Sequence, residues 1–323
     1  MLVHESRRRA LSLLVSPLLL CAPVARAADY PTRTVRIVVA TSPGGGDDFA
    51  ARVLAAQLSA QLKQQFVIEN RPGAGGVIGQ LAVAKSPPDG YSLLLAGGSM
   101  AGARFVNANA TYDLMKDFTP ISTIESSPFA LVVNPALPVK SLKEFIEHAR
   151  ERPGKLTYAT IGAGQIPYWA MLVLNGRAGI QAVEVAYKNI GDAVTDVVAG
   201  RTDYFIAPLV TAAGMNERLR ILGVTSATRS NMLPDVPSIA ETLPGYDMPA
   251  WRSIMGPAGL SAEVVSVLNR EIQKALASPE LRERYSKAGS TPLGSTPEEL
   301  RKRYADWSMI FDKIARDANI RPQ

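Results

Sequence analysis

Short apolar runs alternate with longer segments of helical periodicity along the chain after about residue 30. The first run, residues 35–40, is almost continuously apolar and stops at a Pro-Gly-Gly-Gly sequence, and residues 51–62 then carry apolar side chains at helical spacing. Asp48 stands where it can cap that helix. Further apolar runs follow at residues 66–69 and 91–96. This alternation predicts an α/β fold with mainly parallel sheets flanked by helices.

A second series of the same kind begins near residue 129. Its expected strands are residues 129–133, 156–160, 183–187, 203–206 and 221–225. The chain then becomes rich in proline and ends in helices, the last announced by a capping box at residues 296–299. The apolar stripe of that helix is expected to face a core, and consists of Leu300, Tyr304, Trp307, Phe311 and Ile314. Two separate α/β units predict two lobes.

The first 27 residues differ from the rest of the chain. Three arginines at positions 7–9 precede an apolar run over residues 10–22 and then Ala25-Arg26-Ala27, which is the order of a secretory signal peptide. The run is too short for a stable membrane-spanning helix. A lipoprotein modified at Cys21 is an alternative, disfavoured by the bulky leucines before it, and a retained N-terminal anchor is another. Cleavage after Ala27 predicts a periplasmic protein.

Charge and residue types exclude several functions. Lys and Arg number 35 against 29 Asp and Glu, and about half of the net charge of +6 belongs to the first 27 residues. No later segment has the dense basic stripe expected of a nucleic-acid binder. Past residue 27 only His148 and no cysteine remain, and a solvated helix face explains His148. Nucleophilic triads and transition-metal sites are therefore disfavoured, and we expect no enzyme, no metal and no cofactor.

Three glycine-rich loops each follow an expected strand and precede an expected helix, at residues 43–48, 73–78 and 162–167. The first lacks the Lys-Ser/Thr ending of a P-loop, and Ile78 and Pro167 replace the third glycine of a dinucleotide fingerprint in the others. Such loops present backbone N–H groups and the positive end of a helix dipole, which suit a carboxylate. They could also be simple turns. One loop in each unit of an exported chain favours anion capture in a cleft between two lobes.

A series of short motifs runs through almost the whole chain after the leader. They are Tyr30-Pro31, Pro43-Gly44-Gly45-Gly46 with Asp48, Glu69-Asn70-Arg71-Pro72-Gly73-Ala74-Gly75-Gly76, Pro88-Asp89-Gly90-Tyr91, Asp235-Val236-Pro237-Ser238, Trp251 and Pro257-Ala258-Gly259. In their order and spacing the sequence resembles the substrate-binding proteins of tripartite tricarboxylate transporters, also called the Bug receptor family.

The resemblance implies a two-lobed fold like that of periplasmic binding proteins, with the ligand cleft between the lobes. The chain crosses twice, near Ser126 and Thr225, so that residues 28–125 and 225–323 form the first lobe and residues 126–224 the second. The resemblance also implies a monomeric receptor that binds a small organic carboxylate and passes it to the integral membrane permease subunits of a transporter. No nucleic-acid partner is implied.

The resemblance further implies that backbone amides and ordered water from two strand–helix loops hold the ligand carboxylate. The site residues carried over are Ser42, Gly44, Gly45, Gly46, Asp47, Asp48, Ala74, Gly75 and Ser99 in the first lobe, and Thr160, Gly162, Ala163, Gly164 and Gln165 in the second. Few side chains contact the ligand in this arrangement, which limits any conclusion on specificity.

Six residues depart from the family pattern, and two of them, Asn189 and Ile190, replace the usual small residues after Lys188. Asp47 stands where threonine is usual, and its carboxylate would repel a ligand carboxylate unless it faces away or meets a cationic group of the ligand. Gln165 is bulky where a small polar residue is usual, and Tyr168-Trp169 stand near the usual histidine. These changes either reshape the pocket for an aromatic or amino-bearing carboxylate, or Tyr168 and Trp169 pack internally.

Two other functions stay open at this point. A sensing protein would dock on the extracytoplasmic domain of a receptor instead of on a transporter. A cleft enzyme is the weaker alternative, because the chain after the leader has so few catalytic side chains.

Overall fold

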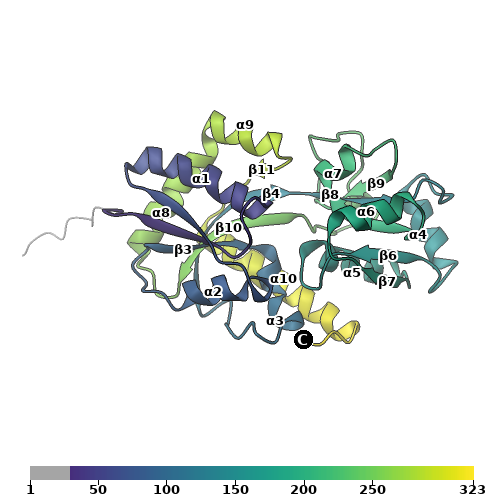
Figure 1. Cartoon of the computed structure of the whole chain (residues 1–323), viewed down its shortest axis with the longest axis horizontal. Coiled ribbons are helices and arrows are strands. Elements are labelled where there is room, and N and C mark those ends of the chain that lie inside the picture. Colours follow the sequence, from purple (N-terminus) through teal and green to yellow (C-terminus); the bar gives the residue numbers. More distant parts are fainter. Residues whose placement is uncertain (1–29) are drawn as a thin grey trace, which may run out of the picture.

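The computed structural model describes residues 30–323, which form two α/β halves side by side along the long axis of the molecule (Figure 1). Each half contains one β-sheet with helices packed against it. The predicted signal peptide, residues 1–27, lies outside the described residues. In the described part of the chain, no helix combines the length and the apolar character needed to cross a membrane.

The first sheet has six strands in the order β11-β4-β10-β3-β1-β2. Their bounds are β1 (Val35–Val39), β2 (Phe66–Asn70), β3 (Ser92–Gly97), β4 (Phe118–Ser127), β10 (Ala250–Pro257) and β11 (Thr291–Pro292). β1 is parallel to β2 and β3, whereas β10 is antiparallel to β3 and β4, and β11 is antiparallel to β4. Because β1, β2 and β3 are parallel, their carboxyl ends share one edge of the sheet and the loops that follow them meet there.

The second sheet has five strands in the order β7-β6-β8-β5-β9. Their bounds are β5 (Phe129–Val133), β6 (Thr157–Thr160), β7 (Val183–Ala186), β8 (Tyr204–Pro208) and β9 (Arg220–Val224). β6 is parallel to β7 and β8, and β5 is antiparallel to β8 and β9. The loop after β6, which carries the second predicted anion site, leaves the carboxyl edge of the parallel strands.

The two-lobed α/β fold predicted from the sequence is confirmed, but the prediction of mainly parallel sheets is wrong. Both sheets are mixed, because antiparallel strands join each parallel set. In the first sheet β10 and β11 run against β1, β2 and β3, and β4 pairs with both of them. The periodicity revealed neither β4 nor β10. β4 is buried yet carries polar Ser122, Thr123 and Glu125, and β10 lies in the stretch that its prolines, Pro249 and Pro257, marked as a loop.

Ten α-helices lie in the described chain. Most of them begin close to the residues predicted from the sequence. They are α1 (Gly46–Leu62), α2 (Val77–Ala84), α3 (Ala103–Val106), α4 (Leu142–Arg150), α5 (Ile166–Ala178), α6 (Ile190–Val198), α7 (Leu209–Ala213), α8 (Ala262–Ala277), α9 (Pro279–Lys287) and α10 (Pro297–Asp317). Thr296 and Glu299 form the predicted capping box of α10. Asp48 is not the cap of its helix: α1 begins at Gly46 after Gly45, and Asp48 lies in the first turn.

The chain passes between the sheets at two places. β4 ends at Ser127 and β5 begins at Phe129, close to the crossing predicted near Ser126. The chain returns to the first sheet at Ala250, where β10 begins. Before that return, residues 225–247 are tied to the second half: the Tyr246 hydroxyl donates to the Ala170 carbonyl of α5 at 3.0 Å, and β9 forms a parallel bridge to Ser238. The return crossing predicted near Thr225 therefore lies later in the chain.

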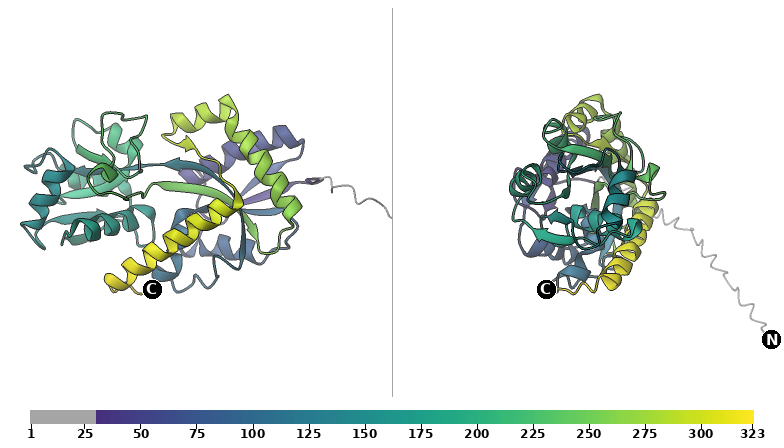
Figure 2. Two further views of the ribbon diagram at one scale, coloured as in Figure 1. Left: turned by 180° about the vertical axis from the view of Figure 1, so that it is seen from behind. Right: turned by 90° about the vertical axis from the view of Figure 1, so that its right-hand side faces the viewer.

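Helix α10 connects the two halves. It runs from beneath the first sheet toward the second half (Figure 2, left). Four members of its predicted apolar stripe, Leu300, Tyr304, Trp307 and Phe311, are buried. The ring of Phe311 stacks on Trp169 of α5 with 4.5 Å between ring centroids. An aromatic contact between α5 and α10 therefore holds the second half against the first.

Candidate functional site

A cavity of about 140 Å³ lies between the two halves, at the edge where the loops after the parallel strands meet. From the first half it is lined by Ala40, Thr41, Asp47, Gly75, Gly76, Gln80, Leu95, Gly97, Gly98 and Ser99, with Ala250, Trp251 and Arg252 of β10. From the second half it is lined by Phe129, Gln165, Ile166 and Pro167. The sequence thus brings the loops after β1, β2, β3 and β6 to one small volume.

A second cavity of about 220 Å³ shares four residues with the first: Gly75, Gln80, Ser99 and Gln165. It extends toward α3 and the chain terminus, and its lining also includes Met100, Ala103, Val106, Asn107, Ala163, Gly164 and Gln323. We call the two volumes together the cleft. Both halves contribute to its walls, which is the arrangement expected of a ligand site between lobes.

Six of the predicted site residues line the cleft and eight do not. Those that line it are Asp47, Gly75, Ser99, Ala163, Gly164 and Gln165. Those outside its lining are Ser42, Gly44, Gly45, Gly46, Asp48, Ala74, Thr160 and Gly162. Thr160 is buried, and its hydroxyl donates to Glu184 at 2.6 Å, so its side chain is engaged within the second half.

Glycine is required at two cleft positions by backbone conformation or close approach. Gly75 has φ of +65° just before α2, a backbone conformation that side chains rarely allow. Gly164 has φ of +89°, and a Cβ at this position would lie 2.8 Å from Val106 Cγ2 of α3. The second-half loop therefore contacts the first half directly, and this contact depends on the missing side chain.

Asp48 fixes the position of the glycine loop at residues 43–48 through hydrogen bonds. Its Oδ2 accepts from the Gly44 N–H at 3.0 Å and from Arg52 Nε at 2.9 Å, and its Oδ1 accepts from Asn70 at 3.0 Å. The Arg52 hydrogen bond, assisted by Gly44 and Asn70, lowers the pKa of Asp48 to about 2 against the opposing effect of burial. Asp48 is thus a positioning residue for the glycine loop.

The lowered pKa of Asp48 predicts a pH effect on stability. A carboxyl group with a lower pKa in the folded state stabilises it above the unfolded pKa, near 3.8, and this contribution is lost as pH falls toward 2. We expect the free energy of unfolding of wild type to fall between pH 4 and pH 2 by more than that of Asp48→Asn. Urea unfolding at each pH measures the difference, with Asp306→Asn, on an exposed Lys302 pair, as control. Parallel pH profiles for wild type and Asp48→Asn would contradict the assignment.

Arg252 is the functional candidate that the sequence interpretation missed. It projects from β10 into the cleft wall, with Nε donating to Asp47 Oδ1 at 2.5 Å and Nη1 donating to Glu125. Burial opposes its positive charge, but Glu125 and Asp47 outweigh that effect and raise the pKa of Arg252, so the guanidinium stays charged. The prolines on both sides of Arg252 predict a loop there, so periodicity gives no sign that Arg252 faces a cleft.

The structure also shows where the unusual residues of the second lobe lie. Trp169 and Tyr168 are buried and line neither part of the cleft. Burial, and to a lesser degree Glu184, raises the pKa of Tyr168 to about 12. The interpretation that these residues pack internally is therefore confirmed. Asp47 does not face away, as one interpretation required: its charge meets Arg252.

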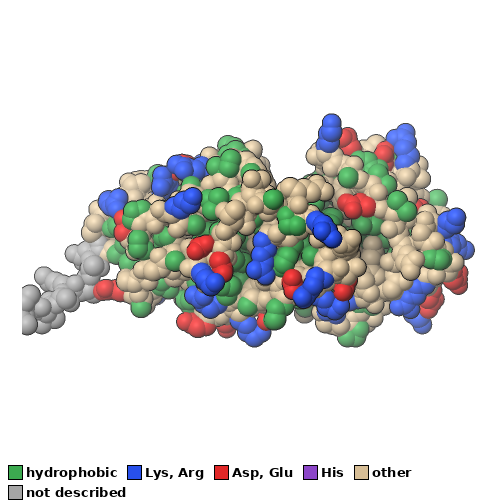
Figure 3. Space-filling view, turned by 90° about the horizontal axis from the view of Figure 1, so that it is seen from below, with side chains coloured by type: hydrophobic (Ala, Val, Ile, Leu, Met, Phe, Trp, Pro, Cys, Tyr) green, Lys and Arg blue, Asp and Glu red, His purple; other side chains and the backbone are tan. Residues whose placement is uncertain are grey.

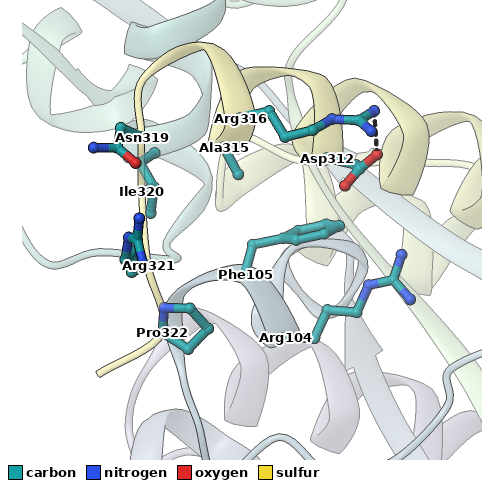
Figure 4. Close-up of a pocket in the computed structure, with 9 residues that line it drawn as sticks. All are labelled: Arg104, Phe105, Asp312, Ala315, Arg316, Asn319, Ile320, Arg321 and Pro322. Carbon is teal, nitrogen blue, oxygen red and sulfur yellow. Dashed lines mark ion pairs between the residues drawn. The ribbon is translucent and has the colours of Figure 1, made fainter.

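A larger, open cavity of about 640 Å³ lies outside the cleft (Figure 4). Its residues come from α3 and from the end of α10 with the segment that follows it; Phe105 lies at its centre, and Arg316 is paired with Asp312 at 2.5 Å. None of the predicted site residues lines it, and the second half contributes nothing. We therefore place the candidate site in the cleft.

One face of the surface carries charges of both signs, and the potential metal ligands of residues 30–323 form no cluster of three. On the face seen in Figure 3, Lys and Arg are intermingled with Asp and Glu, and the outline is notched between the two halves. Among residues 30–323, no group of three or more His, Cys, Asp or Glu side chains is arranged to hold a metal ion.

Comparison with known proteins agrees with the geometry. Residues 50–320 match the tripartite tricarboxylate transporter family receptor. The chain belongs to this receptor family. It is 35% identical to BugT of Bordetella pertussis (strain Tohama I) over 306 residues, which cover 93% of this chain and 92% of that protein. The resemblance to the Bug receptor family is thereby confirmed.

Solved structures resemble this receptor over most of its length. An R. palustris protein with adipate has a TM-score of 0.76 and 33% identity, covering 91% of this chain and 100% of that one. MatC from Rhodopseudomonas palustris with bound malate has a TM-score of 0.72 and 28% identity, covering 88% and 100%. Family membership makes this chain a solute-binding receptor, and the family is one of receptors and not of enzymes.

Proposed function

We propose that this receptor captures a small organic carboxylate in the cleft and delivers it to the permease subunits of a tripartite transporter. The observation that carries the proposal is the cleft itself: strand–helix loops of both halves and the guanidinium of Arg252 surround one small volume. The related structures that hold adipate and malate support the choice of ligand class.

The loops provide donors suited to a carboxylate. The N–H groups in the first turn of α1 and α5 have no carbonyl partner within their helices, and each helix dipole is positive at that end. Pro167 lies in the first turn of α5, where its missing N–H removes no helix hydrogen bond. Backbone N–H groups of α5 in the second half, and Arg252 of β10 in the first half, would hold the ligand between them.

We revise the predicted binding set and lobe limits accordingly. The residues proposed to contact the ligand are Asp47, Gly75, Gln80, Ser99, Ala163, Gly164, Gln165 and Arg252. The lobes are proposed as residues 30–127 with 250–323, and 128–249. Residues 1–27 are proposed as a signal peptide cleaved after Ala27, which places the receptor in the periplasm, consistent with its family.

A ligand panel tests the proposal. Thermal unfolding of residues 28–323 is measured with mono- and dicarboxylates of three to eight carbons, aromatic carboxylates and amino acids. A ligand at 100 times its dissociation constant adds about 2.7 kcal/mol to the free energy of unfolding and raises Tm. We expect an upward shift with at least one carboxylate, saturating with concentration. No shift across the whole panel would contradict the proposal.

Two glycines of the second loop form a matched pair for locating the ligand. Gly162→Ala and Gly164→Ala both place a side chain at positive φ, but only Gly164 has a neighbour, Val106, in the path of the new Cβ. We expect Gly164→Ala to weaken binding of the best carboxylate at least ten-fold, because it pushes the loop away from α3. Gly162→Ala should change the affinity much less. Isothermal titration measures both, and equal effects would argue against contact of the two halves in the bound state.

A further inference from the structure

The charged side chains in the cleft do not balance. Arg252 is the one basic residue in the cleft lining, and it is shared by two carboxylates, Asp47 and Glu125. The Glu125 side chain is 1% exposed, that of Arg252 is 16% exposed, and that of Asp47 is 36% exposed. Two carboxylates and one guanidinium give the three groups a formal net charge of −1. A cleft wall with this charge does not by itself attract an anion.

Burial determines which carboxylate balances Arg252 and which one a ligand can reach. Glu125 lies in β4 behind the cavity and also accepts from the Ser127 hydroxyl at 2.6 Å, so it is enclosed by protein. A buried carboxylate needs a counter-ion, and Arg252 is the one that contacts it. Asp47 belongs to the cavity lining and is partly exposed. Asp47 is therefore the excess negative charge that faces the ligand.

Polar groups of several residues that line the same cavity still lack partners within residues 30–323, and the indole N–H of Trp251 is one of them. Arg252 Nη2 makes no hydrogen bond within residues 30–323; it lies beside Gly46, where a Cβ would be 2.8 Å away. The amide of Gln80 is also unpaired within those residues, although the residue is only 7% exposed and its Oε1 is fully buried. Gln80 lines both parts of the cleft. The cleft thus offers a free guanidinium donor beside a partly exposed carboxylate.

We propose that the cleft takes a zwitterionic ligand, a small amino carboxylate, in preference to a dicarboxylate. This inference rests on the proposed function and specifies its ligand class. The ligand carboxylate meets Arg252 Nη2 and the loop amides, and its ammonium group meets Asp47.

The charges decide between the two ligand classes. A dicarboxylate brings a second negative group toward Asp47 in a partly desolvated site, where like charges repel strongly. A zwitterion brings a cation to the same place and leaves the net charge of the site unchanged. The volume fits a short ligand, because the first cavity alone, at about 140 Å³, has room for about five waters at ~30 Å³ each.

Matched ligands test the inference. ω-Amino carboxylates and α,ω-dicarboxylates of three to six carbons, for example 4-aminobutyrate and glutarate, are titrated calorimetrically into residues 28–323, together with the α-amino acids aspartate and glutamate. We expect the best amino carboxylate to bind at least ten-fold more tightly than the dicarboxylate of the same length. Tighter binding of the dicarboxylates would overturn the inference and leave the proposed function intact. No binding by any carboxylate would overturn both.

A variant without the charge of Asp47 provides a second test of the inference. Asp47→Asn keeps the shape of the side chain and removes the excess charge. We expect it to weaken binding of the amino carboxylate at least ten-fold and to strengthen binding of the matched dicarboxylate by a similar factor. Asp89→Asn, which removes a carboxylate from an exposed pair with Arg33 outside the cleft, should change neither affinity. An equal change for both ligands in Asp47→Asn would contradict a direct contact with the ammonium group.

Discussion

Replacing Arg252 by methionine should lower the free energy of unfolding by about 3–5 kcal/mol, because it leaves Glu125 buried without a counter-ion. Glu125 is almost wholly enclosed, and its other side-chain partner is the hydroxyl of Ser127. Urea unfolding without ligand measures the effect.

Two further variants separate this charge effect from loss of packing. In the double variant Arg252→Met with Glu125→Gln no charge is left buried, so most of the lost stability should return. Arg33→Met breaks an exposed ion pair with Asp89 and should lower the free energy of unfolding by less than about 1 kcal/mol. If the double variant is as unstable as Arg252→Met alone, the ion pair with Glu125 does not determine stability at this site.

Trp169→Ala should lower the free energy of unfolding by about 3–5 kcal/mol, since it removes a large, fully buried side chain. The loss falls at a junction of the two halves: Trp169 stacks on Phe311 of α10 and packs against Gly102, where a Cβ would lie 2.7 Å from the indole. Phe311 in turn contacts Trp307, and Trp307 contacts Trp251 beside the cleft.

Two control variants accompany Trp169→Ala. One keeps a ring stacked on Phe311, and the other lies outside this contact. Trp169→Phe retains a ring against Phe311 and should lose much less stability than Trp169→Ala. Met309→Ala, at a side chain 65% exposed on the same helix, should be near neutral. Urea unfolding measures all three. A small loss in Trp169→Ala would mean that other contacts hold the halves together.

Much of the fold follows from local patterns. The strands that begin each α/β unit are short apolar runs followed by a turn sequence, and the capping box at Thr296 marks the start of α10 within one residue. These signals lie in neighbouring residues, so a single sequence reveals them. The sequence does not reveal β4 and β10, because their burial depends on pairing between distant segments of the chain. β10 pairs with both β3 and β4. The polar residues of β4 and the prolines around β10 concealed that pairing.

The cleft could be predicted in its position but not in its charges. Glycine loops after parallel strands point to one edge of a sheet whatever the tertiary details, and six of the predicted residues line the cleft. Asp47, Glu125 and Arg252 come together from three distant segments, and only the folded chain shows that Arg252 serves both carboxylates. Trp169 illustrates the opposite case: an unusual residue beside a predicted site packs into the core.

The central claim is that a small carboxylate binds between the two halves, and a crystal structure with the carboxylate that gives the largest thermal shift tests it most directly. We expect the ligand within the cleft, with a carboxylate oxygen within hydrogen-bond distance of Arg252 and contacts to Gly75, Gln80 and Gln165. A ligand in the open cavity beside Arg104 and Arg321, or contacts with one half alone, would contradict the claim.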